Sequence, residues 1–458
     1  MPGRTLARHP VSLAGAMLAS ASGVVFIALF IAELLGLFEN PYAALVVFVA
    51  VPALLVLGLL LIPFGMWLER RRLRQHPGSE REWFVIDFRS AATRRKAVLV
   101  AALTGVNIVI VLLAGYGSLH SMESPEFCGQ TCHTPMHPQF TAWQNAPHSE
   151  VTCVQCHIGE GGRAFVKYKL NGLRQMYHVV TGHYPRPIPG VADMRPAAQV
   201  CGKCHWPGKG FGDVVRIKRE YADDQTNTET ATILQLFLGG PGAPTAAGRA
   251  IHWHADPRVQ IEFTYTDVER QSIKFVKYTD AQGRVREFTA EGTTPEELAK
   301  GNRRAMDCVD CHNVPAHRVV PAPEQAVDAA IAAGRIDRSL PFVRREGVRL
   351  MTATYQSGDD AGRRIDQELR KFYSEQGRAA DAPVTGAVKV LQDIYRRNVF
   401  PEMKVTFGTY PDNGGHTTSA GCFCCHDGSL VAKDGSSIGS DCEYCHKQIE
   451  ARPPDVTQ

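Results

Sequence analysis

One short motif recurs along this chain and constrains what can fold around it. Two cysteines stand three positions apart and a histidine follows the second, at 153–157, 201–205, 308–312, 422–426 and 442–446. With 13 cysteines and 17 histidines in 458 residues, chance would produce only about 0.01 such matches. A sixth copy, at 128–133, has one extra residue between its cysteines. We number these motifs one to six in chain order.

The motif is the attachment signal of a c-type haem, in which two thiols bond the porphyrin vinyls and the adjacent imidazole binds iron. Structural zinc or disulfides would not need a histidine after every second cysteine. We therefore predict six covalent haems, attached through Cys128, Cys132, Cys153, Cys156, Cys201, Cys204, Cys308, Cys311, Cys422, Cys425, Cys442 and Cys445. The expected proximal iron ligands are His133, His157, His205, His312, His426 and His446. Cys424 is left over, and we expect it to be an unreactive or metal-adjacent thiol.

Three uncharged runs are long enough to cross a bilayer, which takes about 20 residues. They extend over 11–32, 41–68 and 97–119, and we predict three transmembrane helices (about 11–35, 41–68 and 97–119). The alternative for the first run is a cleaved signal peptide, because the run contains small residues at 19–23.

The distribution of basic residues predicts how the helices are oriented. The segment 4–8 is basic, and the loop 69–96 holds nine Lys or Arg against four acids. By the positive-inside rule both belong in the cytoplasm, together with the N-terminus. The third helix then places residues 120–458 in the periplasm, the side on which c-type haem is attached. Bulk charge is mild, 50 basic against 46 acidic residues, and does not indicate a nucleic-acid partner.

The chain divides by pattern into four regions. We predict a membrane anchor at 1–119, a region with motifs one to three at 120–205, a haem-free insert at 206–307, and a region with motifs four to six at 308–458. Alternating apolar residues in the insert, at 259–265, 273–275 and 285–288, predict a small antiparallel β unit. Helical periodicity is expected at 324–333, 360–375 and 387–397. The fold class is therefore mainly α, with a haem-packed domain and a β insert.

A low-spin haem needs a second ligand on the far side of its iron. Nine histidines remain outside the motifs and the cytoplasm, enough for bis-histidine ligation of most or all haems. The distal candidates are His148, His317, His416, His183 and one of His252 or His254. Met136 is a candidate for the first haem, although a methionine there is equally compatible with packing. His120 lies at the membrane edge, where it could simply cap the third helix.

Several segments resemble the NapC/NirT family of membrane-anchored multihaem cytochromes c. They are 127–136, 147–148 with 153–159, 165–172 and 308–317. The C-terminal segments 400–403, 408–411, 415–416 and 421–427 resemble a longer branch found in metal-reducing bacteria, whose members are inner-membrane quinol dehydrogenases. The family usually has one anchor helix, whereas this chain has three.

The resemblance implies menaquinol as substrate, anaerobic respiration as the setting, and periplasmic cytochromes or a periplasmic reductase as electron acceptors. It also implies that motif one lies nearest the quinol, with Lys167 or Lys169 touching the quinol oxygen. An acid often follows that lysine in the family, but Arg174 and Met176 occupy the corresponding area. Glu123 and Glu126 are the alternative proton acceptors, and Glu33 is an intramembrane acid that could lie on a proton path.

Two other function classes compete with a quinol dehydrogenase. A terminal reductase of a small nitrogen or sulfur oxyanion would need an iron without a distal ligand, yet histidines are abundant. A haem-based redox sensor would need a signalling output, and the cytoplasmic loop is too short to form a folded domain. A homo-oligomer is compatible with the sequence.

Overall fold

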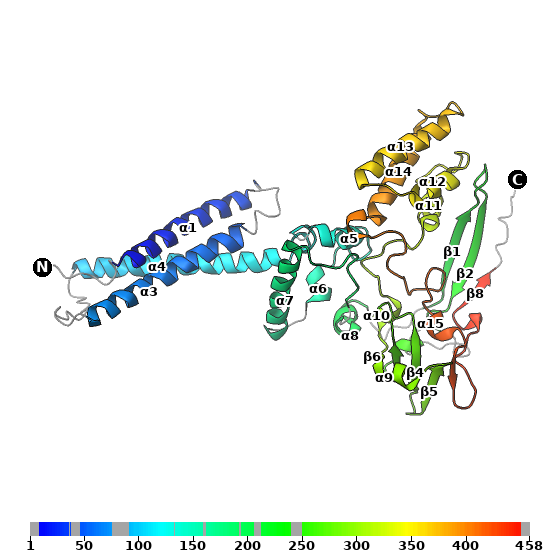
Figure 1. Cartoon of the computed structure of the whole chain (residues 1–458), viewed down its shortest axis with the longest axis horizontal. Helices are drawn as coiled ribbons and strands as arrows, with labels where there is room; N and C mark the ends of the chain where they lie inside the picture. Colours follow the sequence, from blue (N-terminus) through cyan, green and yellow to red (C-terminus); the bar gives the residue numbers. More distant parts are fainter. Residues whose placement is uncertain are drawn as a thin grey trace. The chain divides into compact units, whose positions relative to one another are not determined.

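The computed structural model of the chain describes residues 9–35, 37, 46–75, 91–131, 133–158, 162–191, 194–205, 212–239 and 250–449. The chain divides into two compact units, Met1–Cys132 and His133–Gln458. Figure 1 labels most of the helices and strands of each unit.

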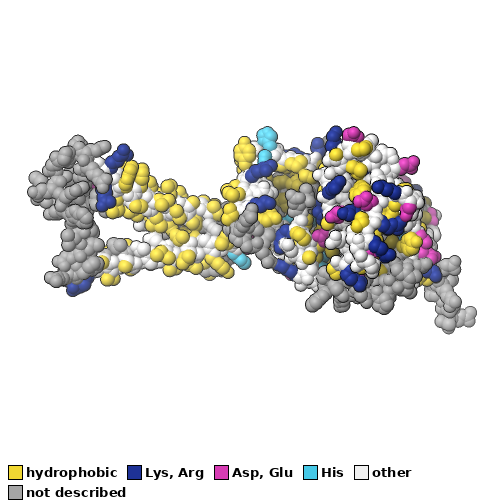
Figure 2. Space-filling model, turned by 90° about the horizontal axis from the view of Figure 1, so that it is seen from below, with side chains coloured by type: hydrophobic (Ala, Val, Ile, Leu, Met, Phe, Trp, Pro, Cys, Tyr) yellow, Lys and Arg dark blue, Asp and Glu magenta, His cyan; other side chains and the backbone are white. Residues whose placement is uncertain are grey.

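The first unit consists of three long helices. They are α1 (Pro10–Leu34), α3 (Val51–Gln75) and α4 (Ala91–Met122), with short π-helical turns at Val46–Ala50 and Phe127–Thr131. The segments Pro10–Ala32, Val46–Arg72 and Ala97–Met122 are long and apolar enough to cross a membrane. Hydrophobic side chains cover the face of these helices that Figure 2 shows. The three predicted membrane helices are thus confirmed by length and composition, while residues 41–45 lie outside the described residues.

Small residues let α1 and α3 pack closely. A Cβ added at Gly58 would lie 2.6 Å from the backbone nitrogen of Ala19, and one added at Gly65 would lie 2.5 Å from that of Ser12. The Ser12 hydroxyl donates to the Ile62 carbonyl at 3.0 Å. Lipid tails are as apolar as the helices, so close backbone approach and such hydrogen bonds drive association within a membrane. These contacts make α1 and α3 a helical hairpin.

The second unit contains more helix than strand and has one apolar helical core. Its helices are α5 (His133–Gln144), α6 (Cys153–His157), α7 (Gly162–Val180), α8 (Ala197–Val200), α9 (Pro295–Lys300), α10 (Cys308–Cys311), α11 (Pro323–Ala332), α12 (Val343–Thr352), α13 (Gly358–Ser374), α14 (Ala382–Asn398) and α15 (Phe423–His426). The apolar faces of α11 to α14 form the core, in which Leu350, Leu369 and Leu391 are fully buried. Burial of that area is the main stabilising contribution here. The helices predicted at 324–333, 360–375 and 387–397 are present as α11, α13 and α14, whereas α12 was not predicted.

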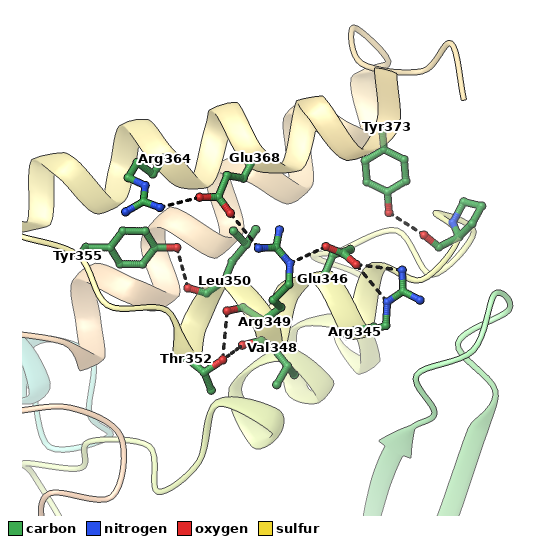
Figure 3. A network of polar contacts seen from close by, with 11 residues as sticks. Arg345, Glu346, Val348, Arg349, Leu350, Thr352, Tyr355, Arg364, Glu368 and Tyr373 are labelled. Carbon is green, nitrogen blue, oxygen red and sulfur yellow. Dashed lines mark hydrogen bonds and ion pairs between the residues drawn. The ribbon is translucent and has the colours of Figure 1, made fainter. Parts of the chain in front are cut away.

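A network of arginines compensates the buried carboxylate of Glu346 beside this core (Figure 3). Glu346 accepts hydrogen bonds from the Nε atoms of Arg345 at 3.0 Å and Arg349 at 2.8 Å. Arg349 also donates to Glu368 at 2.8 Å, and Arg364 donates to the other oxygen of Glu368 at 3.1 Å. The hydrogen bond from Arg349 is the main reason that the pKa of Glu368 lies below its ordinary value. The network joins α12 to α13 through charge-assisted hydrogen bonds.

The buried Tyr373 provides a test of this core. Its hydroxyl donates to the Pro341 carbonyl at 3.0 Å, and the side chain is fully buried. Tyr373→Phe should lower the free energy of unfolding by about 1–2 kcal/mol, because the carbonyl loses its partner in an apolar environment. Thermal unfolding followed by circular dichroism measures the change. Tyr444→Phe, at an exposed position, is the matched control and should change stability by less than about 0.5 kcal/mol. Equal effects would contradict this role of the hydroxyl.

The strands of the second unit form two antiparallel sheets. One has the order β1 (Val214–Tyr221), β2 (Glu229–Leu236), β8 (His446–Ile449). The other has the order β6 (Asn302–Ala305), β3 (Gln260–Tyr265), β4 (Ile273–Thr279), β5 (Val285–Ala290), β7 (Leu430–Ala432). The predicted antiparallel β unit is therefore present as β3 to β5. Alternate residues such as Ile261 and Phe263 are buried, as a sheet with one covered face requires.

Both sheets combine the insert with the C-terminal region. Strand β7 pairs with β5, and β8 pairs with β2. Strand β8 begins at His446, the histidine of motif six. The sheets thus connect residues 214–305 to the segment that carries motifs five and six.

Candidate haem sites

Motifs two to six lie on single helical turns. Motif two forms α6, motif four begins with α10, and motif five includes α15, while motifs three and six contain the 3₁₀ turns Cys201–Lys203 and Cys442–Tyr444. A helical turn places residues i and i+3 on one face, so both thiols of a motif can reach one porphyrin edge. In motif one, Cys132 and the side chain of His133 lie outside the described residues.

Buried charges hold motif four in place. The Asp310 carboxylate, 7% exposed, accepts from Arg270 Nη1 at 2.7 Å and from Arg304 Nε at 2.8 Å. Asp307 caps α10 by accepting from the backbone N–H of Cys308 at 2.7 Å. Its other oxygen accepts from the backbone N–H of Ala197 at 2.7 Å, at the start of α8, which leads into motif three. These interactions fix the turns of motifs three and four against each other.

Five motif histidines each face a histidine from elsewhere in the second unit. The ring centroids are separated by 6.0 Å for His157 and His317, 6.0 Å for His205 and His148, 6.2 Å for His312 and His252, 5.9 Å for His426 and His254, and 6.0 Å for His446 and His416. All five partners are among the predicted distal candidates. The sequence left open which of His252 and His254 faces a motif. In the structure each faces a different one, His252 motif four and His254 motif five.

This spacing fits two imidazoles that bind one iron from opposite faces. A metal–imidazole bond is about 2 Å long, and the ring centre lies about 1 Å beyond the nitrogen, so bis-histidine ligation requires centroids about 6 Å apart. The donor set of two cysteines and two imidazoles at each of motifs two to six therefore fits a covalently bound haem.

Backbone carbonyls orient four of these imidazoles. A carbonyl can only accept, so each Nδ1 carries its proton and leaves the Nε2 lone pair for a metal. The bonds are His148 Nδ1 to the Pro315 oxygen at 3.1 Å, His254 Nδ1 to the Ile251 oxygen at 2.7 Å, His317 Nδ1 to the Gln139 oxygen at 3.1 Å, and His426 Nδ1 to the Gly439 oxygen at 2.6 Å.

Burial keeps several of the rings neutral. It lowers the pKa of His254 to about 4 and is the main reason that the pKa values of His157, His252 and His317 are also lowered. A neutral imidazole has the free nitrogen lone pair that iron binding requires. These four rings are therefore in the protonation state of a ligand at neutral pH.

The remaining predicted ligands are less well defined. Met136 lies half-buried on α5, and His183 is exposed just after α7. Cys424 is half-buried against the apolar core under β3 to β5, and burial raises its pKa to about 11. The Cys424 thiol is therefore protonated at neutral pH and a weak nucleophile.

The residues predicted for the quinol site lie in both units. In the second unit, α7 carries Lys167, which is exposed, and Lys169, which is half-buried. In the first unit, Glu123 directly follows α4 and is half-buried, and Glu126 is exposed. The side chain of Glu33 lies outside the described residues. Their roles stay predictions.

Sequence reasoning missed the charged residues that support motif four. Arg270 and Arg304 come from the insert, and Asp310 occupies a variable position of the motif, so motif spacing gives no signal for them. The Pro-Ala-His sequence that ends at His317 gave a distal candidate but not the motif it faces.

Comparisons with known proteins agree with these sites. Residues 91–187 match the N-terminal region of the NapC/NirT cytochrome c family. The cytochrome c-type protein ImcH of Geobacter sulfurreducens is 35% identical over 459 aligned positions, which cover 98% of this chain and 90% of that protein. No solved structure matches the chain. The chain therefore belongs to the NapC/NirT family and is a membrane-anchored multihaem cytochrome c that transfers electrons.

Proposed function

We propose that this chain is a hexahaem quinol dehydrogenase of the inner membrane, which oxidises menaquinol and passes the electrons to periplasmic acceptors. The observation that carries the proposal is the set of five imidazole pairs. Two protein nitrogens on one iron leave no position for a substrate, as suits electron transfer. When bound, each haem supplies one-electron iron chemistry.

The ligand-bearing segments support a continuous path between the sites. His148 lies five residues before motif two and faces His205, the histidine of motif three. His317 lies five residues after His312 of motif four and faces His157, the histidine of motif two. Five residues span at most about 18 Å. His252 and His254 connect motifs four and five over two residues, and His416 lies six residues before motif five and faces the histidine of motif six. Short connections of this kind suit electron tunnelling from site to site.

Quinol oxidation at the membrane surface requires a polar group beside an apolar tail and a nearby one-electron acceptor. We assign the polar group to Lys167 or Lys169 and the first acceptor to motif one. Glu123 and Glu126, which follow the apolar span of α4, are the alternative proton acceptors. The basic segment 4–8 and the basic loop 69–96 support a cytoplasmic N-terminus and a periplasmic second unit.

The pairs weigh against the alternative of a terminal oxyanion reductase. Such an enzyme needs an iron with one open face, and the pairs supply ligands on both faces at motifs two to six. Electrons are therefore expected to leave for another protein, either a periplasmic cytochrome or a periplasmic reductase. We expect electrons to leave from motif six, because it is the last motif in the series that the ligand-bearing segments connect.

Anaerobic mixing of the lipid-reconstituted protein with a menaquinol analogue tests the proposal. Haem reduction, followed by absorbance, should be rapid, and Lys167→Ala or Lys169→Ala should slow it at least tenfold, equivalent to about 1.4 kcal/mol. Lys218→Ala, on β1, is the matched control and should leave the rate unchanged. Haems that stay oxidised with quinol but reduce with dithionite would overturn quinol oxidation and require electron entry from a protein.

A further inference from the structure

Helix α7 carries an apolar stripe that faces away from the protein. Val166, Leu170, Leu173, Tyr177 and Val180 follow one another at spacings of three or four residues, so they form one line along the helix. Their side chains are 55%, 62%, 61%, 66% and 84% exposed, and Met176 beside them is 42% exposed. A contiguous apolar surface of this kind marks an interaction site.

Two residues on the opposite side of α7 are less exposed than the stripe. Tyr168 and Val179 are half-buried and lie across the helix from it. The most exposed face of α7 is thus apolar, whereas a surface helix usually exposes its polar face. Packing within the second unit therefore does not explain why the stripe is apolar.

Basic residues flank the stripe on both sides. At about 100° per residue, Lys167 and Arg174 lie along one border of the stripe and Lys169 lies along the other. An apolar face bordered by Lys and Arg is the arrangement of a helix that lies in a membrane interface. The long basic side chains can extend to anionic headgroups while their methylene groups stay beside the acyl chains.

The second unit is tethered to a helix that can cross a membrane. The second unit begins within eleven residues of the end of α4, a helix long and apolar enough to cross a membrane. Eleven residues span at most about 40 Å. Because of this tether, α7 meets lipid at a high effective concentration. A soluble partner would have to compete with that lipid for the apolar stripe.

We propose that α7 lies in the membrane interface, with the stripe from Val166 to Val180 among the acyl chains and its flanking cations at anionic headgroups. The second unit is then held at the bilayer by a second contact besides its connection to α4. This position would bring Lys167 and Lys169 to the depth of a quinol headgroup. The inference itself does not depend on quinol oxidation.

Photo-crosslinking to lipid tests the proposal on the oxidised full-length protein without quinol. The protein is placed in nanodiscs of phosphatidylethanolamine and phosphatidylglycerol with a phospholipid that carries a photoreactive group on its acyl chain. Peptides of α7 should be labelled, as should those of α1, α3 and α4, which serve as internal positive controls. Val215 and Ile217 on β1 are 57% and 53% exposed and should stay unlabelled, which controls for exposed apolar side chains in general.

A double variant adds a matched comparison. Leu170→Gln with Leu173→Gln should reduce labelling of α7 at least fivefold, whereas Val215→Gln with Ile217→Gln should not change it. Nanodiscs of phosphatidylcholine alone should also reduce labelling of α7, because the anionic headgroups are lost. Labelling confined to α1, α3 and α4 would overturn the proposal, as would protein crosslinks from α7 to a second copy of the chain. Haem reduction by quinol is measured separately, so failure of one result leaves the other intact.

Discussion

Replacing both His252 and His254 with alanine should leave two irons with one protein ligand each. Their rings lie 6.2 Å from that of His312 and 5.9 Å from that of His426, across the space that an iron would occupy. Loss of the second nitrogen ligand converts a low-spin haem to a high-spin haem that binds exogenous ligands. Electron paramagnetic resonance with spin integration should therefore find high-spin signal equivalent to two haems per chain.

Single variants and a control sharpen this test. His252→Ala and His254→Ala should each add one high-spin haem, and carbon monoxide should bind the reduced protein in the same proportions. His137→Ala is the matched control: His137 is an exposed histidine, 3.3 Å from Glu402, and its loss should add no high-spin haem. A double variant whose haems all stay low-spin would show that the short 3₁₀ helix Ile251–Ala255 does not ligate iron.

Gly421→Ala should disrupt the sites of motifs five and six together. Gly421 has a φ of +49°, and an added Cβ would clash with the Gly415 carbonyl oxygen. The Gly415 carbonyl also accepts a hydrogen bond from the backbone N–H of Cys422 at 3.1 Å. The clash would therefore disturb both the start of motif five and Gly415, which directly precedes His416. A non-glycine residue at positive φ costs about 1–3 kcal/mol, and the unrelieved clash adds to this. We expect a loss of at least about 3 kcal/mol in stability.

Thermal unfolding and haem content measure this effect. The variant should unfold at a lower temperature and should either lose haem or show high-spin haem at these two motifs. Gly415→Ala is the matched control, because an added Cβ there meets no atom within 4 Å and its φ is not positive. Equal stability and equal low-spin content in the two variants would contradict the tight packing at Gly421.

The haem motifs could be predicted from sequence because covalent attachment fixes residue type and spacing locally. The same holds for the three membrane helices, whose length is set by the bilayer. Distal ligands were identified as candidates by elimination but could not be paired. His157 and His317, for example, come together only through the tertiary fold, and no local pattern records that contact.

Other elements were missed for physical reasons. Helix α12 is amphipathic, with Leu350 fully buried, but it is short, contains the weak helix former Gly347 and buries the charged Glu346, which disfavours its prediction from sequence. Strands β7 and β8 have only three and four residues, and they exist because β5 and β2 offer them open edges. Asp310 occupies a variable position of its motif, so its role is evident only from its ion pairs with Arg270 and Arg304.

The coordination state of the wild-type irons decides whether the five imidazole pairs bind haem iron. Mass spectrometry of the intact chain counts the covalent haems, and near-infrared magnetic circular dichroism of the oxidised protein identifies the axial ligands of each low-spin iron. Six haems are expected, at least five of them low-spin with two histidine nitrogens. Fewer than six haems, or two or more irons that are high-spin or sulfur-ligated, would contradict it.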